Sequence, residues 1–346
     1  QVKLVGGINV PKLVVAVDSH GGKHRQLVKS GDDMRQDAVM EQLFGIVNQL
    51  FAASPEAERR ELNIVQYNVI PFSPVAGLVQ WVENTMPVSQ YLYNSSSAER
   101  RKYCECQKLL QHAQAAQESS ASRRGAPQSL SEAYRRCLGI MRPRMHEFFL
   151  DHFPEAADWY ERRLAFTRSV ATNSIVGHIL GLGDRHLSNI LIRVDTAEVV
   201  HIDLGIAFDQ GRILKIPEQV PFRLTPAIVD GMGVGGVEGV MRRCCEETLH
   251  VLRRNKETLM TIIEVFIHDP LYKWALTPVQ ALQKQLQDQA EAQGGGVEED
   301  DDLIWNPDGS RALQQVQRKI EGITGVGGPA SVKGQVQQLF QEAQSV

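Results

Sequence analysis

The chain has 346 residues, of which 42% are hydrophobic and 23% charged, a composition typical of a globular protein long enough for two lobes with separate cores. Its net charge of −4 argues against a body dedicated to nucleic-acid binding. No apolar run approaches the ~20 residues of a membrane-spanning helix, and no secretory signal stands at the start.

The cysteines number five and include Cys104 and Cys106 as well as the adjacent Cys244 and Cys245. An odd number with this spacing fits neither a disulfide framework nor a zinc site, so it indicates a reducing compartment. The chain begins in mid-pattern without Met, and we therefore expect a fragment of a longer protein.

Residues 1–86 predict a small β-rich lobe that carries one helix. Asp32 or Asp33 offers a helix cap, and apolar residues then recur with helical spacing from Val39 to Phe51. Segments rich in β-branched and aromatic residues predict strands around this helix. The expected strands are residues 12–18, 24–29, 62–72 and 77–82.

From about residue 87 the pattern becomes helical. A polar stretch at 94–130 contains an expected loop at 119–128, and residues 204–236 hold three prolines and many glycines. A long irregular segment of the latter kind is typical of a functional loop. The expected helices are residues 134–149, 159–182 and 237–269, the last divided near Asn255.

The C-terminal part contains a Gln-rich, helix-prone stretch, three glycines and an acidic run within residues 279–302. We expect its later portion to be mobile. This segment could block a substrate groove, contact a second subunit or serve only as a linker. Two further helices are predicted, at residues 310–323 and 332–343.

Residues 181–205 carry the most informative pattern. Phosphoryl transfer needs a group beside the nucleophilic hydroxyl and oxygen ligands for magnesium next to the nucleotide. Asp184, His186 and Asn189 precede a predicted hairpin that delivers Asp203 at its far end. Because a hairpin brings its ends together, Asn189 and Asp203 should lie side by side as magnesium ligands. Each residue alone could be an ordinary turn or strand-end residue, but the ordered set indicates a phosphotransferase.

The small lobe offers candidate phosphate-binding groups. Gly6 and Gly7 lie at the front edge of the first hairpin, where small residues let the backbone approach phosphates, although Gly-Gly is also an ordinary turn. Lys29 ends a strand and is a candidate phosphate clamp held by a carboxylate of the next helix. Without the catalytic pattern, a surface lysine would be the simpler reading.

Three further residues suggest the rest of a nucleotide pocket. Asp37 lies one turn into the first helix and could bond the phenol of Tyr67 across the lobe. Trp81 lies where the lobe ends, and its indole suits either an adenine ring or packing at a hinge.

Several motifs together resemble the phosphatidylinositol-3-kinase-related protein kinases, most closely the ATM-type DNA-damage checkpoint kinases. The resemblance is close over about residues 1–280 and resumes weakly at 310–346. The last residues resemble the start of the family's C-terminal FATC helices, without its aromatic-rich end. The motifs are residues 26–37, 181–189, 201–205, 220–225, 230–233 and 236–245.

The resemblance implies an α+β, bilobal kinase fold with a β-rich N-lobe and a mainly helical C-lobe. The implied domains are an N-lobe at 1–86, a C-lobe at 87–278, a regulatory linker region at 279–325 and a partial FATC at 326–346. Within the C-lobe, residues 181–189 would be the catalytic loop and residues 203–233 the activation loop.

The resemblance also implies roles for single residues. Asp184 would orient or deprotonate the substrate hydroxyl, His186 would stabilise the transferring phosphoryl group, and Asn189 and Asp203 would bind magnesium. Lys29 would hold the α- and β-phosphates. Asp37 and Tyr67 would line the back of the pocket. The residues implied to enclose adenine are Pro11, Leu27, Val79, Trp81, Val82, Leu191 and Ile202, with the backbone of Gln80 and Val82 reading its edge.

The implied function is an ATP- and magnesium-dependent Ser/Thr protein kinase of the DNA-damage response, with manganese as an alternative metal. Its substrates would carry Ser or Thr followed by Gln, and it would act in the nucleus. As partners, the resemblance implies a homodimer formed through the full-length protein and a DNA-end-sensing complex that binds outside this fragment.

Two other functions are compatible with the same scaffold. A phosphoinositide kinase should present a cationic cluster in its activation loop, because its substrate carries several negative charges. A pseudokinase would lack catalytic groups, and every expected group is present. The loop charges balance and favour a protein substrate: Arg212, Lys215 and Arg223 against Asp209, Glu218 and Asp230.

Overall fold

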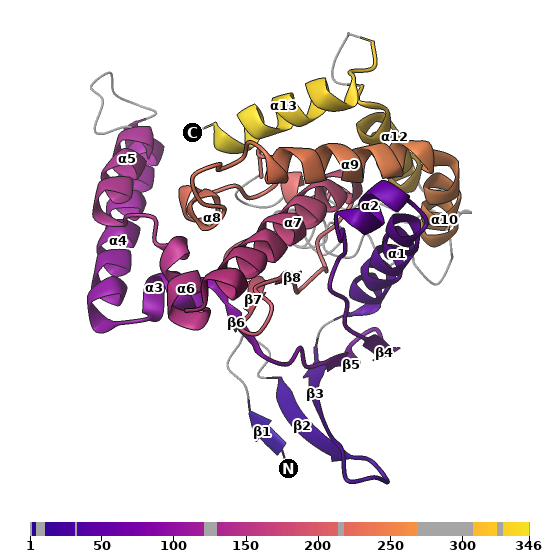
Figure 1. Cartoon of the computed structure of the whole chain (residues 1–346), viewed down its shortest axis with the longest axis horizontal. Coiled ribbons are helices and arrows are strands. Elements are labelled where there is room, and N and C mark those ends of the chain that lie inside the picture. The colour runs from indigo at the N-terminus through magenta and orange to yellow at the C-terminus, as the bar shows by residue number, and fades with distance from the viewer. Residues whose placement is uncertain are drawn as a thin grey trace, which may run out of the picture.

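A computed structural model describes most of the chain (Figure 1). The described residues are 2–4, 11–31, 33–120, 130–213, 218–268, 307–323 and 328–345. The expectations for Gly6, Gly7, Asp32, the loop at 119–128 and the segment 279–302 lie wholly or almost wholly outside these ranges. Among the described residues, no helix is long and apolar enough to cross a membrane.

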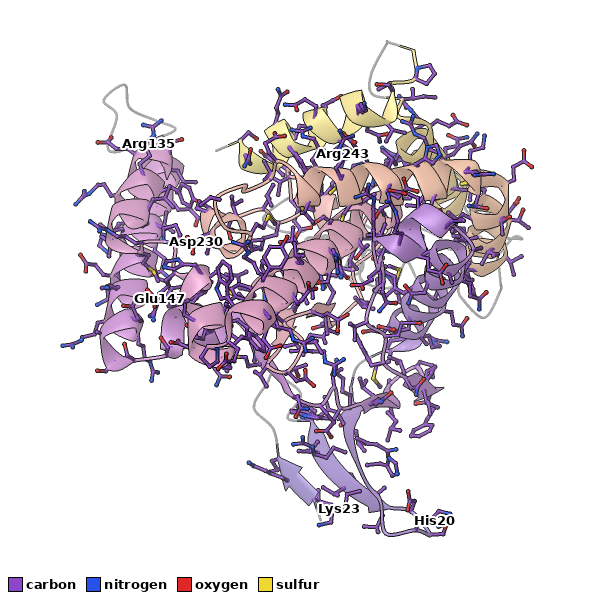
Figure 2. The ribbon with its side chains drawn as sticks, in the orientation of Figure 1. His20, Lys23, Arg135, Glu147, Asp230 and Arg243 are labelled. Atoms are coloured by element: carbon purple, nitrogen blue, oxygen red, sulfur yellow. The ribbon has the colours of Figure 1, made fainter. Side chains whose placement is uncertain are left out.

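A five-stranded antiparallel sheet lies at the N-terminal end, in the order β1-β2-β3-β5-β4. Its strands are β1 Val2–Leu4, β2 Lys12–Val17, β3 Lys23–Ser30, β4 Val69–Ser73 and β5 Ala76–Gln80. Asp18 Oδ1 accepts hydrogen bonds of 2.8 Å from the amides of His20 and Gly22, which forms the hairpin turn expected between β2 and β3. Figure 2 shows His20 and Lys23 at the tip of this hairpin, far from the helical part.

Helix α1 (Arg35–Ala52) is the expected helix of the small lobe. The N-cap expected at Asp33 is wrong, because the helix is capped at Met34, which makes no side-chain cap hydrogen bond. Asp33, one residue earlier, accepts a hydrogen bond of 3.1 Å at Oδ1 from the Arg35 amide. Short helix α2 (Pro55–Arg59) follows. The apolar face of α1 is buried and packs against β4, α2 and α9.

The strand expected at 62–72 is wrong over its first half, because only β4 from Val69 is a strand. The preceding segment runs beside α1 and bonds to its side chains instead of to another strand. Asn48 Oδ1 accepts from the Ile64 amide at 2.9 Å, and Asn48 Nδ2 donates to the Ile64 carbonyl at 2.8 Å. The β-branched residues here are buried against a helix, which strand propensity alone does not distinguish.

The rest of the described chain is mainly helical and is built around α7 (Ala156–Leu180), which α9 crosses (Figure 1). Its other helices are α3 Val88–Asn94, α4 Ser97–Ser120, α5 Leu130–Ile140, α6 Met145–His152, α8 Pro226–Gly231, α9 Val240–Arg254, α10 Lys256–His268, α12 Pro307–Glu321 and α13 Val332–Gln344. The division expected near Asn255 is confirmed. The helix expected at 134–149 is two helices, α5 and α6, since Pro143 interrupts it.

A second sheet joins the two parts, in the order β6-β7-β8. Its strands are β6 Thr85–Pro87, β7 Ile190–Arg193 and β8 Val199–His201. The β7–β8 hairpin is the predicted one, whereas β6 was not predicted. The α+β class expected from the sequence is confirmed.

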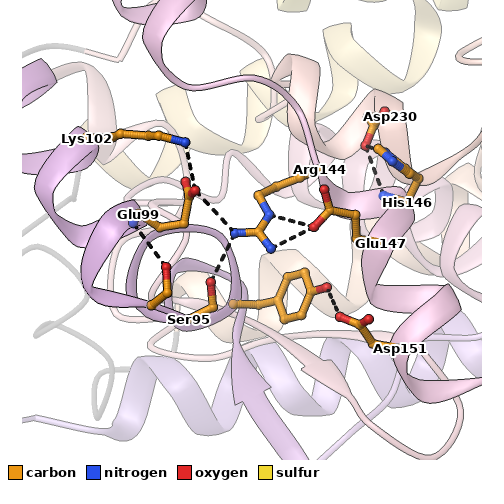
Figure 3. Close-up of polar contacts among 10 residues, drawn as sticks. Ser95, Glu99, Lys102, Arg144, His146, Glu147, Asp151 and Asp230 are labelled. Carbon is orange, nitrogen blue, oxygen red and sulfur yellow. Dashed lines mark hydrogen bonds and ion pairs between the residues drawn. The ribbon is translucent and has the colours of Figure 1, made fainter.

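Figure 3 shows polar contacts that tie α3, α4, α6 and α8 together. Arg144 donates to Glu147 at 2.7 Å and to Ser95 Oγ at 3.2 Å. Asp230 of α8 accepts from the His146 amide at 2.9 Å, and its Oδ2 lies 2.7 Å from His146 Nδ1. These contacts anchor the far end of the irregular segment 204–236 to the N-terminus of α6.

Candidate active site

The candidate catalytic loop follows the C-terminus of α7. The helix ends through Gly181, whose φ of +62° is a left-handed cap that favours glycine. The Leu180 and Gly181 carbonyls accept hydrogen bonds of 2.8 and 3.0 Å from the amides of Phe208 and Asp209. The loop therefore starts with its backbone bonded to the beginning of the irregular segment.

The β7–β8 hairpin brings Asn189 opposite the residue before Asp203. The Ile202 amide donates to the Asn189 carbonyl at 3.0 Å, and Ile190 pairs with His201. The Asn189 side chain donates to the Asp184 carbonyl at 3.1 Å and lies 3.4 Å from Asp184 Oδ2. The catalytic loop itself thus brings the expected catalytic acid and the first expected metal ligand into contact.

Asp184 and His186 both reach solvent. His186 Nε2 lies 3.9 Å from Asp184 Oδ2, and the side chains are 52% and 41% exposed respectively. The Asp184 amide donates to Glu218 Oε1 at 2.7 Å, so a residue of the irregular segment supports the loop from behind. An acid and an imidazole at this distance can both reach an incoming hydroxyl and the phosphoryl group it attacks.

Asp203 is exposed directly after β8 and has a φ of +58°. Next to it, the Leu204 amide donates to Asp37 Oδ1 at 2.9 Å. A Cβ on Gly205 would lie 3.6 Å from Asp37 Oδ2 and 4.0 Å from Asp203 Oδ1. Asp37, expected at the back of the pocket, therefore lies on the same side of Gly205 as the second expected metal ligand.

The donor set fits a hard cation that is shared with a triphosphate. Asn189 uses its amide nitrogen for Asp184, which leaves the side-chain oxygen of Asn189 as the atom that could bind a metal. Among the described residues, no group of three or more His, Cys, Asp or Glu side chains could hold a metal unaided. Magnesium bound by one or two protein oxygens with phosphates and water needs no such group.

Arg185 is a functional residue that sequence reasoning missed. It is buried, and its guanidinium donates to the carbonyls of Gly183 at 2.7 Å, Ile202 at 2.8 Å and Asp203. Burial lowers its pKa, while Asp203 and Asp184 oppose this shift. Arg185 thus joins the catalytic loop to the chain that bears Asp203. Its position between Asp184 and His186 was the available signal.

On the sheet side, strand register fixes the expected adenine-facing residues. Leu27 pairs with Val79 across β3 and β5, and the Trp81 amide donates to the Arg25 carbonyl at 3.1 Å. The Arg25 guanidinium lies 5.8 Å from the centre of the Trp81 ring. Val82, Val79 and Ile202 pack against the buried core, and Leu191 belongs to it, while Pro11 is half-buried.

The backbone between the two parts carries groups that could read a base edge. The Gln80 amide donates to the Asn68 carbonyl at 2.8 Å, so the Gln80 carbonyl is the group that could accept from a base. The Val82 carbonyl accepts from Thr85 Oγ1 at 2.8 Å, so the Val82 amide is the group that could act as the complementary donor. One acceptor and one donor match the pairing edge of adenine.

Buried acids surround Tyr67 behind this pocket. Burial raises the Tyr67 pKa well above its ordinary value, and the charges of Asp37 and Glu41 add to the effect. Burial also raises the Glu41 pKa to about 8, and Glu41 accepts from the Tyr67 amide at 3.2 Å. The hydrogen bond expected between Asp37 and the phenol stays a prediction. So does the phosphate contact of Lys29, which pairs with Gly77 on β5.

Comparison with known proteins identifies the family. A model of the phosphatidylinositol 3- and 4-kinases matches residues 24–276. The chain is 50% identical over 354 residues to the serine/threonine-protein kinase ATM of Arabidopsis thaliana, spanning 99% of this chain and 9% of that protein. It is 43% identical over 364 residues to the serine-protein kinase ATM of Sus scrofa, spanning 99% and 12%.

A solved structure of the open conformation of CtTel1 superposes with a TM-score of 0.81 at 38% identity, covering 99% of this chain and 12% of that one. This likeness confirms the bilobal kinase fold and the homology to ATM and Tel1 kinases. The chain spans only 9% to 12% of the length of these three relatives. Since the family model matches well over half of its residues, the chain belongs to the phosphatidylinositol 3- and 4-kinase family.

Proposed function

We propose that this protein is an ATP- and magnesium-dependent Ser/Thr protein kinase that phosphorylates Ser or Thr followed by Gln. The observation that carries the proposal is the contact between Asp184 and Asn189. Asn189 in turn lies opposite Ile202, the residue that precedes Asp203. The homologues are named serine/threonine-protein kinases, which supports a protein acceptor.

In this proposal residues 1–86 are the N-lobe and residues 87–278 the C-lobe, followed by the linker region and the partial FATC. Asp184 orients or deprotonates the acceptor hydroxyl, and His186 stabilises charge on the transferring phosphoryl group. Lys29 holds the α- and β-phosphates. Asn189 and Asp203 hold magnesium, which when bound neutralises charge on the triphosphate.

A lipid substrate is the alternative, and the contacts made by the basic residues of the activation loop argue against it. Arg223 donates through Nε to the Arg185 carbonyl, so its guanidinium is engaged inside the protein. Arg212 is exposed and lies 3.8 Å from Asp209, whose carboxylate also pairs with Lys319 at 2.7 Å. Lys215 lies outside the described residues. One of the two described cations is thus engaged inside the protein, and a single exposed arginine is not the cationic cluster that a polyanionic headgroup needs.

The wider role is also part of the proposal. We place the protein in the DNA-damage response, with telomere maintenance, checkpoint control and DNA repair as its processes and the nucleus as its site. Two related solved structures are Tel1 dimers, which supports a homodimer of the full-length protein. A DNA-end-sensing complex would bind outside this chain.

The deciding experiment measures phosphate transfer by the full-length protein to a Ser-Gln peptide, a matched Ser-Ala peptide and phosphoinositide vesicles. We expect transfer to the Ser-Gln peptide, weaker transfer to the Ser-Ala peptide and none to the vesicles. Turnover of lipid alone would contradict the protein-kinase reading, and equal use of the two peptides would contradict the Gln preference.

A further inference from the structure

The end of helix α12 touches two elements of the candidate active site. Lys319 Nζ donates to Asp209 Oδ1 at 2.7 Å and to the His178 carbonyl at 2.9 Å. Asp209 lies six residues after Asp203, and His178 is in the last turn of α7, just before the catalytic loop. One ammonium group therefore joins the beginnings of both loops.

The contact is shielded from water. The Lys319 and Asp209 side chains are 14% and 17% exposed. An ion pair in such surroundings is screened less than a surface pair, and loss of either partner leaves an uncompensated buried charge. The last carbonyls of a helix also favour a nearby cation, so His178 at the end of α7 strengthens the site.

The backbone at this contact has an unusual conformation. Phe208 and Asp209 have φ values of +53° and +62°, although neither is glycine. Such a pair persists only where its surroundings fix it. The hydrogen bonds of these two residues to Leu180 and Gly181 do so from the backbone, and Lys319 does so from the Asp209 side chain.

Lys319 is itself held in place by two other helices. Gln335 of α13 donates through Nε2 to the Lys319 carbonyl at 2.7 Å. Arg253 of α9 donates to the Ile320 carbonyl at 2.8 Å and to Gln335 Oε1 at 2.6 Å. The ammonium group is thus presented from a fixed backbone and is not a loose surface charge.

We propose that Lys319 is a positioning residue for phosphoryl transfer. Resting on the kinase function proposed above, it acts through Asp209 and the end of α7 and touches neither nucleotide nor acceptor. It fixes the start of the activation loop against the start of the catalytic loop. The separation of Asp184 from Asp203 then depends on a helix more than 100 residues downstream of both.

The test measures steady-state kinetics of the full-length protein with ATP and a Ser-Gln peptide. Lys319→Met is expected to lower kcat by about tenfold to 100-fold, because small misplacements of reacting groups have effects of this size. The KM for ATP should change by less than about twofold, since the sheet side of the pocket is untouched. Lys319→Arg, which keeps the cation, should recover most of kcat.

Asp209→Asn should lower kcat similarly, and adding Lys319→Met to it should have little further effect, because both changes break one contact. Lys333→Met on the exposed side of α13 is the matched control and should match wild type in kcat and thermal unfolding. Normal kcat in Lys319→Met, or multiplicative losses in the double variant, would overturn the proposal.

If Lys319→Met fails to fold, the kcat of Asp209→Asn serves as the test. An unchanged kcat in that variant would overturn the proposal. Failure of the proposed function would be distinguishable, because the wild-type protein would then transfer no phosphate to the peptide at all.

Discussion

The strands of the five-stranded sheet and the strands beside the catalytic loop differ in how they hold their functional side chains. Residues of β2 and β3 are exposed or half-buried along their length, whereas most of β7 and β8 is buried. On the sheet side, ladder register and a few exposed contacts, such as that of Arg25 with Glu83, place the side chains. On the catalytic side, each loop is bonded to several elements. We therefore expect changes on the catalytic side to have the larger effects on turnover.

The strongest test of this difference removes a metal ligand. Asp203→Ala should lower kcat roughly 1,000-fold or more, because charge stabilisation dominates phosphoryl transfer. Its side chain is exposed, so stability should fall by about 1 kcal/mol, the cost of alanine at a positive φ. Kinase assays and urea unfolding measure the two effects. Asp195→Ala, an exposed acid at the tip of the same hairpin, should leave kcat unchanged. Unaltered turnover in Asp203→Ala would remove the metal-ligand assignment.

A second test separates chemistry from nucleotide binding. Asp184→Asn should lower kcat about 100-fold to 10,000-fold, the range for loss of a positioned acid or base, with little change in the KM for ATP. The reason is that Asp184 acts on the acceptor. Peptide phosphorylation at varied ATP concentration measures both constants. Parallel losses in kcat and ATP affinity would instead indicate a structural role.

A third test addresses the bonds that hold the catalytic loop. Arg185→Lys should destabilise the protein by about 2 kcal/mol, because an ammonium cannot reach all three carbonyls that the guanidinium bonds. Urea unfolding at fixed pH measures the loss. Arg193→Lys, at a less buried arginine on β7, should change stability by less than about 0.5 kcal/mol. Equal effects of the two changes would mean that the loop is held by other contacts.

The last expected effect lies beside the sheet, and it is a dependence of stability on pH with no predicted change in turnover. The Glu41 pKa is raised from 4.5 to about 8, so the folded state binds a proton that the unfolded state releases between these values. Stability should therefore fall as pH rises from 4.5 to 8, by up to about 1.4 kcal/mol per pH unit. Glu41→Gln should remove this slope, as thermal unfolding across the pH range would reveal. A slope that survives the substitution would place its origin in another group.

The sequence predicted the catalytic hairpin well because its information is local. Two apolar runs, a short turn and polar residues at both ends suffice to predict the hairpin, and the structure has it, with Ile190 paired to His201. The same holds for α1, whose apolar residues recur with the period of a helix. The convergence of the Asn189 and Asp203 side chains on one metal stays a prediction.

What the sequence did not predict depends on partners far along the chain. The segment before β4 looks like a strand until the Asn48 side chain supplies its hydrogen bonds from α1. The sequence shows Arg185 only as part of a motif, and its hydrogen bonds to three backbone carbonyls become visible only in the structure. No sequence motif marks Lys319, because its role depends on a contact with Asp209, which lies 110 residues earlier in the chain.

The long separation in sequence between Asp209 and Lys319 has a consequence during translation. Ribosomes add about 5 to 20 residues per second, so α12 follows the activation loop out of the ribosome only after several seconds. During that interval the nascent chain already contains Asp184, Asn189 and Asp203 but not the lysine that steadies them. If Lys319 positions the two loops as proposed, phosphoryl transfer by the nascent chain would stay about tenfold to 100-fold slower until α12 has emerged.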